Sequence, residues 1–177
     1  PGLLGLADLA GYKATKREPV CSFYRVWAVC GMGPPSSGGI ATLQILGILQ
    51  NFDLAKLEPG SAQAVHLISE ASRLAFADRN LYLADPDFVS VPTLRLIDPG
   101  YLGGRAKGIR MDATLGRARP GKMGRRSIRR LAPDDHAGGP STTHLSVVDG
   151  DGNAVALTSS IQGAFGSKLL VRGFLLN

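Results

Sequence analysis

The chain has 177 residues, of which 44% are hydrophobic, and a formal net charge of +6. This length and composition exclude an intrinsically disordered protein and suit one folded domain with its own core. No run approaches the ~18–20 consecutive apolar residues of a membrane-spanning helix, and no signal peptide is visible. Because the chain begins at Pro1 and stops at Asn177, directly after a strand-like run, we expect it to be a piece of a larger protein.

Two β-prone runs, residues 20–24 and 27–31, are expected to fold back on each other at Arg25-Val26. A two-residue turn at this point places Cys21 opposite Cys30, at a separation that suits a disulfide. Two buried free thiols are the alternative, because the turn lacks the Asn-Gly or Gly-Gly pair that fixes such a register.

A Gly/Pro-rich turn at residues 31–39 leads into two predicted helices. Apolar residues recur at helical spacing over residues 40–52, with Ser36 or Ser37 available as the N-cap. The second helix begins after the N-cap Ser61 and ends near residues 82–85. Its predicted inner face consists of Val65, Ile68, Ala71/Ser72 and Ala75/Phe76. His66, in the same helix, is interpreted as a core or boundary histidine held by a hydrogen bond.

Residues 83–92 and 96–104 are predicted to be extended or turn segments, because a residue that precedes proline avoids the helical region. Residues 105–130 then hold ten Lys and Arg against the single acid Asp112, so the basic charge lies in one segment. With no interleaved aromatics and no hydrophobic period, this segment is predicted to be a solvated, mobile linker. An anion-binding tail is the alternative, and its binding would weaken with salt. That tail would use Arg125, Arg126, Arg129 and Arg130.

The last part of the chain is predicted to be β. Residues 143–149 and 153–161 alternate between apolar and polar side chains around the turn sequence DGDG, which indicates a hairpin. A further strand pair is expected from Ala164 onward. Helices that precede strands favour an α+β fold over a regular βαβ winding.

No metal or cofactor is predicted. Asp149, Asp151 and Asn153 match the first ligands of a calcium-binding loop, but Ala154 and Ser160 stand at its sixth and twelfth positions. Asp134-Asp135-His136 lacks the spacing of a metal site, and residues 31–39 lack the lysine of a phosphate loop. There is no Gly-x-Ser-x-Gly elbow, so ordinary serine-hydrolase chemistry has no support.

Thr142 and Thr143 stand where the linker meets the first strand of the hairpin. A threonine hydroxyl needs a base, and the α-amine of an amino-terminal threonine, with a pKa of about 7.7–8.0, supplies one. That chemistry requires cleavage of the Ser141–Thr142 bond, which an exposed Gly/Pro-rich linker accommodates. A plain hairpin with hydroxyls on its polar face is the alternative.

The runs TTHLSVVDGDGNAVALTSSIQGAFGSKLL, GMGPPSSGG, FADRNLYLADPDFVSVP and GFLLN resemble the γ-glutamyltransferase family of N-terminal-nucleophile enzymes. The resemblance covers nearly the whole chain and is weakest over residues 105–137. It implies a partial αββα sandwich, truncated at both ends. Residues 1–141 would end the large subunit, with a helical region at 37–85 and a linker at about 105–141, and residues 142–177 would begin the small subunit.

The resemblance implies that Thr142 is the nucleophile and that the Ser141–Thr142 bond is cut by the protein itself. Thr143 and His144 match the motif as supports. Thr158 and Ser160 stand where the family places hydroxyls near the nucleophile, with Ser160 in place of a more usual threonine. Gln162 stands where many members carry an asparagine or an acid that contacts the glutamyl moiety.

The implied activity is transfer of the γ-glutamyl group of glutathione or related amides to water, an amino acid or a dipeptide. The implied partners are the rest of the protein's own large and small subunits, without nucleic acid, outside the cytoplasm. Because the family's substrate arginine lies upstream of Pro1, and its paired serines and oxyanion-hole glycines lie beyond Asn177, the isolated 177 residues are expected to be inactive. The segment after Phe165 is about two residues shorter than the family pattern. A non-catalytic member and a relative with another acyl specificity, such as a cephalosporin acylase, are the alternatives.

Overall fold

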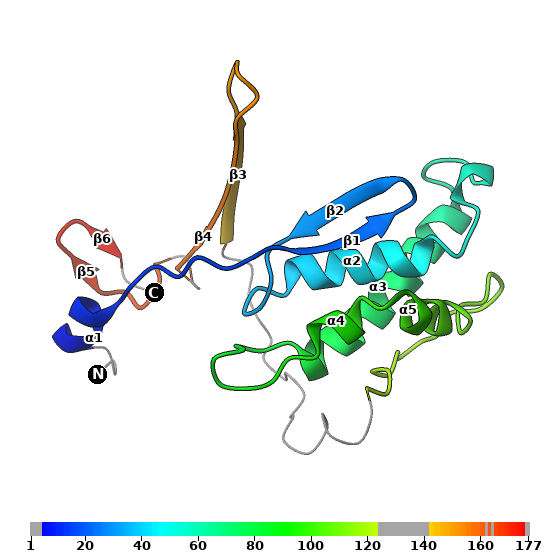
Figure 1. Ribbon diagram of the computed structural model, residues 1–177, viewed down its shortest axis with the longest axis horizontal. Coiled ribbons are helices and arrows are strands. Elements are labelled where there is room, and N and C mark those ends of the chain that lie inside the picture. Colours follow the sequence, from blue (N-terminus) through cyan, green and yellow to red (C-terminus); the bar gives the residue numbers. More distant parts are fainter. Residues whose placement is uncertain (1–4, 124–141, 162, 164, 176–177) are drawn as a thin grey trace. The chain divides into compact units, whose positions relative to one another are not determined.

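The computed structural model describes residues 5–123, 142–161, 163 and 165–175 of the chain (Figure 1). The chain divides into two compact units, Pro1–Asp134 and Asp135–Asn177. Helices and strands both occur, as expected for an α+β protein. In the first unit the elements are α1 (Leu6–Gly11), β1 (Val20–Tyr24), β2 (Trp27–Gly31), α2 (Gly38–Leu49), the 3₁₀ turn η1 (Leu54–Lys56), α3 (Ala62–Tyr82), α4 (Thr93–Leu96) and α5 (Pro99–Ala106). In the second they are β3 (Thr142–Val148), β4 (Ala154–Ser160), β5 (Leu170–Val171) and β6 (Phe174–Leu175).

Helix α2 is the centre of the first unit. It packs against α3, α5 and the β1–β2 hairpin (Figure 1). Its buried residues accordingly lie on more than one side of the helix. Its predicted position is confirmed, although it ends at Leu49 rather than Phe52. The reason is Asn51, whose side-chain amide donates to the carbonyls of Gly47 and Ile48 at 2.9 and 3.1 Å and so satisfies the last turn.

The β1–β2 hairpin forms in the predicted register, with Cys21 opposite Cys30 and Tyr24 opposite Trp27. The two cysteines are joined by a disulfide, and their Cα atoms lie 4.1 Å apart. Arg25, in the turn, has a φ of 55°. Its guanidinium donates to the carbonyl of Phe52 at 3.0 Å, just beyond the end of α2, which fixes a turn that has no glycine.

Helix α3 begins at the predicted N-cap, since the Ser61 hydroxyl accepts from the Ala64 amide at 3.3 Å. Its predicted inner face is partly wrong. Val65, Ile68 and Phe76 are 54%, 50% and 51% exposed, although Ala71 and Ala75 are buried as expected. The inner face also carries two carboxylates, and its buried residues are Leu67, Glu70, Ala71, Leu74, Ala75, Asp78 and Tyr82.

The two buried carboxylates hold the segment that follows α5. Glu70 accepts from the Thr114 hydroxyl and from the Leu115 amide, each at 2.7 Å. Asp78, two turns further along α3, accepts from the Gly121 amide at 2.7 Å and from the Tyr101 hydroxyl at 2.6 Å. These bonds lay residues 114–121 along α3.

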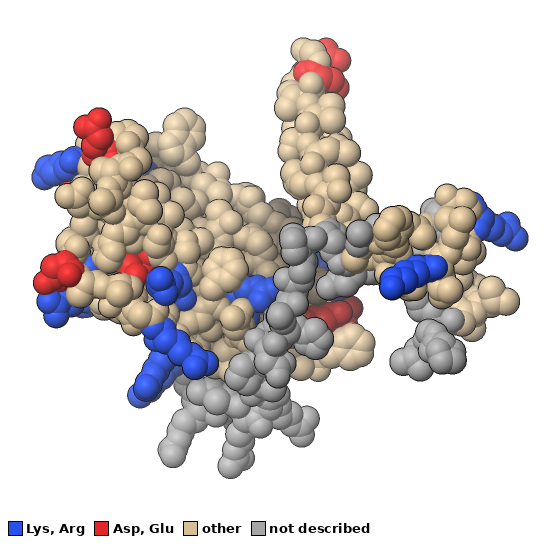
Figure 2. All heavy atoms as spheres, turned by 180° about the vertical axis from the view of Figure 1, so that it is seen from behind, with Lys and Arg blue, Asp and Glu red and all other residues tan. Residues whose placement is uncertain are grey.

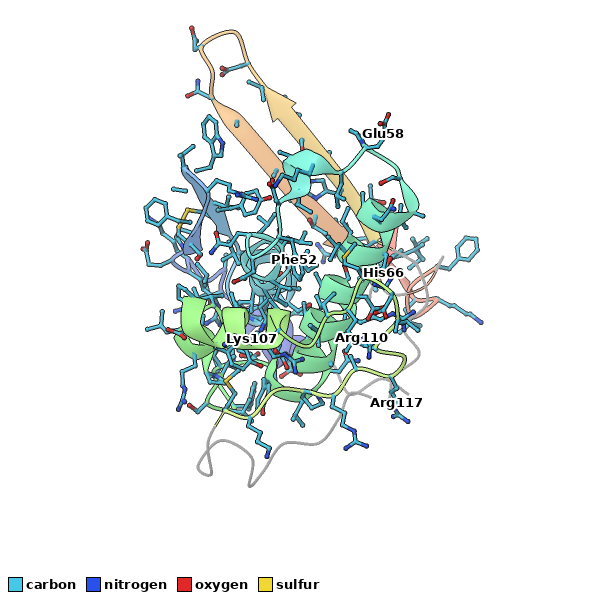
Figure 3. The ribbon with its side chains drawn as sticks, turned by 90° about the vertical axis from the view of Figure 1, so that its right-hand side faces the viewer. Phe52, Glu58, His66, Lys107, Arg110 and Arg117 are labelled. Carbon is cyan, nitrogen blue, oxygen red and sulfur yellow. A yellow bond between two sulfur atoms is a disulfide. The ribbon has the colours of Figure 1, made fainter. Side chains whose placement is uncertain are left out.

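The prediction of a mobile linker from residue 105 is therefore wrong for residues 105–123. The Arg105 guanidinium lies 3.2 Å from the carboxylate of Asp78, and Ile109 and Met123 are only 8% and 3% exposed. The segment shows no hydrophobic period because its anchors are backbone amides and hydroxyls that bind carboxylates. Figure 3 shows His66 and Arg110 side by side, and the His66 ring nitrogen Nε2 lies 2.7 Å from the Arg110 carbonyl. The predicted boundary histidine is confirmed, while residues 124–141 of the predicted linker lie outside the described residues.

The expectation of turns over residues 96–104 is wrong as well, because α5 occupies Pro99–Ala106. Asp98 is the extended N-cap, and its side chain accepts from the Tyr101 amide at 2.7 Å. The proline therefore stands at the first helical position, where it needs no hydrogen-bond partner. The rule about residues before proline holds for Asp98 itself, and the prediction for residues 83–92 is confirmed, because they form neither helix nor strand.

The described residues of the second unit form two hairpins. β3 pairs with β4 from Thr142 opposite Ser160 to Val148 opposite Ala154, which confirms the predicted hairpin. Gly152 supplies the positive φ, 84°, that its turn needs. The shorter pair β5–β6 turns at Arg172 and Gly173, with φ values of 48° and 94°. Within the described part of the chain, no helix has both the length and the apolar character needed to cross a membrane.

Candidate active site

The β3–β4 hairpin sorts the candidate residues onto two faces. Side chains alternate along a strand, and opposed residues share a face. The register therefore puts Thr142 on one face with its partner Ser160, and Thr158 on the same face opposite His144. Three of the predicted site residues, Thr142, Thr158 and Ser160, thus lie together on one face of one hairpin.

Thr143 lies on the opposite face, opposite Ser159. Its neighbours along that face are the apolar pairs Leu145–Leu157 and Val147–Val155. All four of these side chains are exposed within the described chain, between 44% and 60%. The register separates Thr143 from Thr142, which adjacency in the sequence had grouped together.

His144 contacts two hydroxyls on the face that carries Thr142. Its ring nitrogen Nδ1 lies 2.7 Å from the Thr158 hydroxyl, and Nε2 lies 3.1 Å from the Ser146 hydroxyl. Sequence reasoning identified His144 as a member of the motif but missed both contacts and did not single out Ser146. The period-2 pattern was the available signal, because it places residues 144, 146 and 158 on one face once the turn fixes the register.

Two predicted site residues, Ser141 and Gln162, lie outside the described residues. The scissile bond before Thr142 and the expected contact of Gln162 with the glutamyl moiety therefore stay predictions. Cys21 and Cys30, the remaining pair, belong to the β1–β2 hairpin of the first unit.

The Asp149 carboxylate forms its hydrogen bonds within the turn between β3 and β4. Asp149 accepts from the amides of Asp151 and Asn153 at 3.0 and 2.8 Å, and from the Asn153 side chain at 2.8 Å. These bonds, first of all the one from the Asn153 side chain, hold the pKa of Asp149 below its usual range. Acidic side chains gather at this tip (Figure 2). Among the described residues, no group of three or more His, Cys, Asp or Glu side chains stands close enough to hold a metal ion.

Sequence reasoning did not select the two buried carboxylates of the first unit, Glu70 and Asp78. Burial would raise the pKa of Glu70, but the bonds from Thr114 and Leu115 and the nearby charges of Arg73 and His66 together hold it below its usual range. Burial, and then the bond to Asp78, raise the pKa of Tyr101 well above its ordinary value. The role we assign to the two carboxylates is structural.

Comparison with known proteins gives these features a family context. A model of the gamma-glutamyltranspeptidase family matches residues 1–177. The chain is 45% identical over 178 residues to the glutathione hydrolase proenzyme of Escherichia coli strain K12, with 99% of this chain and 29% of that protein covered. It is 41% identical over 172 residues to the acylase ACY 1 proenzyme of Pseudomonas sp. strain SE83, with 97% and 28% covered. The chain thus spans less than a third of the length of these relatives.

Solved structures agree with the sequence comparison. The crystal structure of Helicobacter pylori gamma-glutamyltranspeptidase matches with a TM-score of 0.65 and 39% identity, over 67% of this chain and 35% of that chain. The crystal structure of cephalosporin acylase from Bacillus halodurans matches with a TM-score of 0.78 and 28% identity, over 99% and 29%.

These neighbours define the class of fold: the chain carries part of the α+β fold of the N-terminal-nucleophile hydrolases. Within that class, the chain belongs to the gamma-glutamyltranspeptidase family.

Proposed function

We propose that this chain carries the nucleophile of a γ-glutamyl acyltransferase and that Thr142 is that nucleophile. The observation that carries the proposal is the placement of Thr142 at the first position of β3, with the hydroxyl-bearing residues Thr158 and Ser160 on its own face. The family model, which matches the whole chain, supports the same assignment.

The proposed enzyme first cuts itself. The Thr142 hydroxyl attacks the carbonyl carbon of Ser141, the peptide bond to the Thr142 nitrogen breaks, and the resulting ester is opened by water. Residues 1–141 then end the large subunit and residues 142–177 begin the small one. The E. coli relative is named as a proenzyme, which supports maturation by cleavage.

The mature enzyme then turns over γ-glutamyl amides. The freed α-amine of Thr142 takes the proton from its hydroxyl, and the oxygen attacks the γ-carbonyl carbon of the substrate. The amide nitrogen leaves with a proton, and an acyl ester remains on Thr142. Water, an amino acid or a dipeptide takes the γ-glutamyl group from that ester. Glutathione is the proposed donor, since the relative at 45% identity is named a glutathione hydrolase.

The supporting residues divide by face. We assign Thr158 and Ser160 to the surroundings of the nucleophile, because they share its face. Gln162 is assigned to the glutamyl moiety of the substrate. Thr143 faces the other way, so its support would act through the backbone of β3 or through packing on the apolar face. The rest of the protein's own subunits would supply the remaining contacts with the substrate.

A site of action outside the cytoplasm is part of the proposal. The Cys21–Cys30 disulfide supports it, because such bonds persist in oxidising compartments and are rare in the cytosol.

A second acyl specificity has its own support. The chain is 41% identical to a protein named an acylase. It also matches a solved cephalosporin acylase over 99% of the present chain. The same nucleophile and the same acyl-ester chemistry would serve a different acyl group.

The test compares full-length Thr142→Ala with the wild type. We expect the variant to remain one uncut chain and to release no product from a γ-glutamyl anilide, while the wild type splits and turns over. A Thr142→Ala protein that still splits and turns over would refute the assignment. Release from a cephalosporin-type amide but not from the γ-glutamyl anilide would favour the second specificity.

A further inference from the structure

The imidazole of His144 is held at both of its nitrogens by hydroxyls of the same hairpin. Nδ1 lies 2.7 Å from the Thr158 hydroxyl across the sheet, and Nε2 lies 3.1 Å from the Ser146 hydroxyl along β3. A histidine with both ring nitrogens engaged has a fixed ring plane. Ser146 thus orients the ring, and the ring in turn contacts Thr158.

The tautomer of the His144 ring decides whether the Thr158 hydroxyl donates a hydrogen bond to Nδ1 or accepts one from it. In a neutral imidazole, one nitrogen donates and the other accepts. If Ser146 donates to Nε2, then Nδ1 donates to Thr158, whose hydroxyl hydrogen stays available to a neighbour. In the other tautomer, Thr158 donates to Nδ1 and offers only lone pairs. Either way, His144 narrows the directions that the Thr158 hydroxyl hydrogen can take: the second tautomer fixes it on Nδ1, and the first excludes the direction toward the ring.

Thr158 stands next to the proposed nucleophile on the same face. Thr142 lies opposite Ser160, and the next pair on that face is His144 opposite Thr158. Thr142 and Thr158 are therefore diagonal neighbours, whose Cα atoms lie about 7–8 Å apart in antiparallel sheets. Two short threonine side chains do not meet directly at that separation, so the Thr158 hydroxyl would act on Thr142 through a bridging water or through the substrate.

We infer that His144 is a positioning residue, which acts on the reaction by fixing the Thr158 hydroxyl beside Thr142. The inference rests on the proposed function. It goes beyond that function by assigning a positioning role to the hydrogen bonds that link Ser146, His144 and Thr158. His144 touches neither substrate nor nucleophile in this account. Its effect is transmitted through Thr158 alone.

Two polar replacements of His144 test its hydrogen bonds to Thr158 and to Ser146 separately. In His144→Asn, the amide stands near the former position of Nδ1 and keeps its reach to Thr158. In His144→Gln, the longer amide stands near the former position of Nε2 and reaches Ser146 instead. His144→Phe keeps the ring and loses both contacts. Ser159→Ala, on the opposite face next to Thr158, is the matched control.

The measurements are the rate of chain splitting and the kcat and KM for a γ-glutamyl anilide, with each full-length variant. We expect His144→Asn to stay within about threefold of the wild type, and His144→Gln and His144→Phe to lose about tenfold in splitting rate and kcat, the effect of one ordinary hydrogen bond. KM should change little in all three variants. Ser159→Ala should match the wild type.

The coupling to Thr158 is tested in a second background. Thr158→Val removes the hydroxyl at nearly constant volume, so adding His144→Phe to Thr158→Val should produce no further loss. Equal rates for the Asn and Gln variants, or losses from His144→Phe and Thr158→Val that multiply, would overturn the inference. If His144→Phe fails to accumulate, the comparison of Asn with Gln carries the test by itself.

Thr142→Ala separates this inference from the proposed function. If Thr142→Ala still splits and turns over, both fail. If it is inert and the Asn and Gln variants are equal, only the role of His144 fails.

Discussion

Glu70 is 2% exposed, and each of its carboxylate oxygens accepts a hydrogen bond from the segment after α5. A glutamine can keep its oxygen on the Leu115 amide and donate its NH₂ group to the Thr114 hydroxyl, but it loses the negative charge that strengthens both bonds and that pairs with Arg73 at 3.3 Å. Replacing two hydrogen bonds to a charged group by neutral ones costs about 1–3 kcal/mol. We therefore expect Glu70→Gln to lower the free energy of unfolding of the full-length protein by about that amount in urea titration.

The matched control for this prediction is Glu58→Gln, because Glu58 is exposed (Figure 3). The same chemical change there should leave the midpoint of unfolding unchanged. Equal midpoints for the two variants would contradict the anchoring role of Glu70.

The charge of Glu70 should also make the stability of the protein depend on pH. Its pKa is lowered on folding from the ordinary value of 4.5, so its contribution is complete above that pH and is lost as pH falls through the lowered pKa. The difference in stability between wild type and Glu70→Gln should therefore shrink between about pH 6 and about pH 3. A difference that stays constant over this range would show that Glu70 is not stabilised as a carboxylate.

Gly39 is a position where the backbone leaves no room. A Cβ atom there would collide with the carbonyl oxygen of Met32, whereas one at the neighbouring Gly38 would meet only the Ser36 hydroxyl at 4.0 Å. We expect Gly39→Ala to destabilise the protein by about 1–3 kcal/mol. Gly38→Ala should be neutral or slightly stabilising. Thermal unfolding of the two alanine variants measures the contrast, and similar melting temperatures would count against the close approach of the first turn of α2 to Met32.

At the scale of single elements, the β1–β2 hairpin depends on its cross-strand disulfide. The bond closes a loop with a sequence separation of 9, for which chain-entropy arguments give about 2–3 kcal/mol. Reduction of the wild type should therefore lower its melting temperature to that of the Cys21→Ser/Cys30→Ser double variant. The double variant itself should not respond to the reductant. A wild type that melts at the same temperature with and without reductant would argue against the bond.

The hairpins were predictable because their determinants are local. The alternation in β3 and β4 and the glycine of their turn fix both the strands and the register. Ser61 and the apolar period likewise predicted the start of α3. The buried side of α3 escaped prediction because Glu70 and Asp78 read as polar, and their partners lie 23 to 45 residues away in the sequence.

Helix α5 was missed for a different reason. Proline at its first position was taken as a breaker, although Asp98 caps the helix directly before it. Of the candidate site, alternation could group Thr142, Thr158 and Ser160 on one face, and separate Thr143 from them. The contacts of His144 needed the structure, because side-chain rotamers do not follow from a pattern.

At the scale of the whole molecule, the chain joins a helical unit with its own core to a hairpin unit whose apolar side chains are exposed. The side chains of Val147 and Val155, for example, are 56% and 60% exposed in the described chain. An isolated two-stranded hairpin is marginal in water. We therefore expect β3–β4 to become stable only within the larger protein, which agrees with relatives more than three times as long as this chain.

The proposed chemistry requires Thr142 to become an amino terminus. Amino-terminal sequencing of the mature full-length protein should therefore find two chains, the smaller of which begins Thr-Thr-His-Leu at Thr142, and one uncut chain for Thr142→Ala. A mature protein that remains uncut between residues 141 and 142, yet turns over a γ-glutamyl anilide, would show that Thr142 is not an amino-terminal nucleophile.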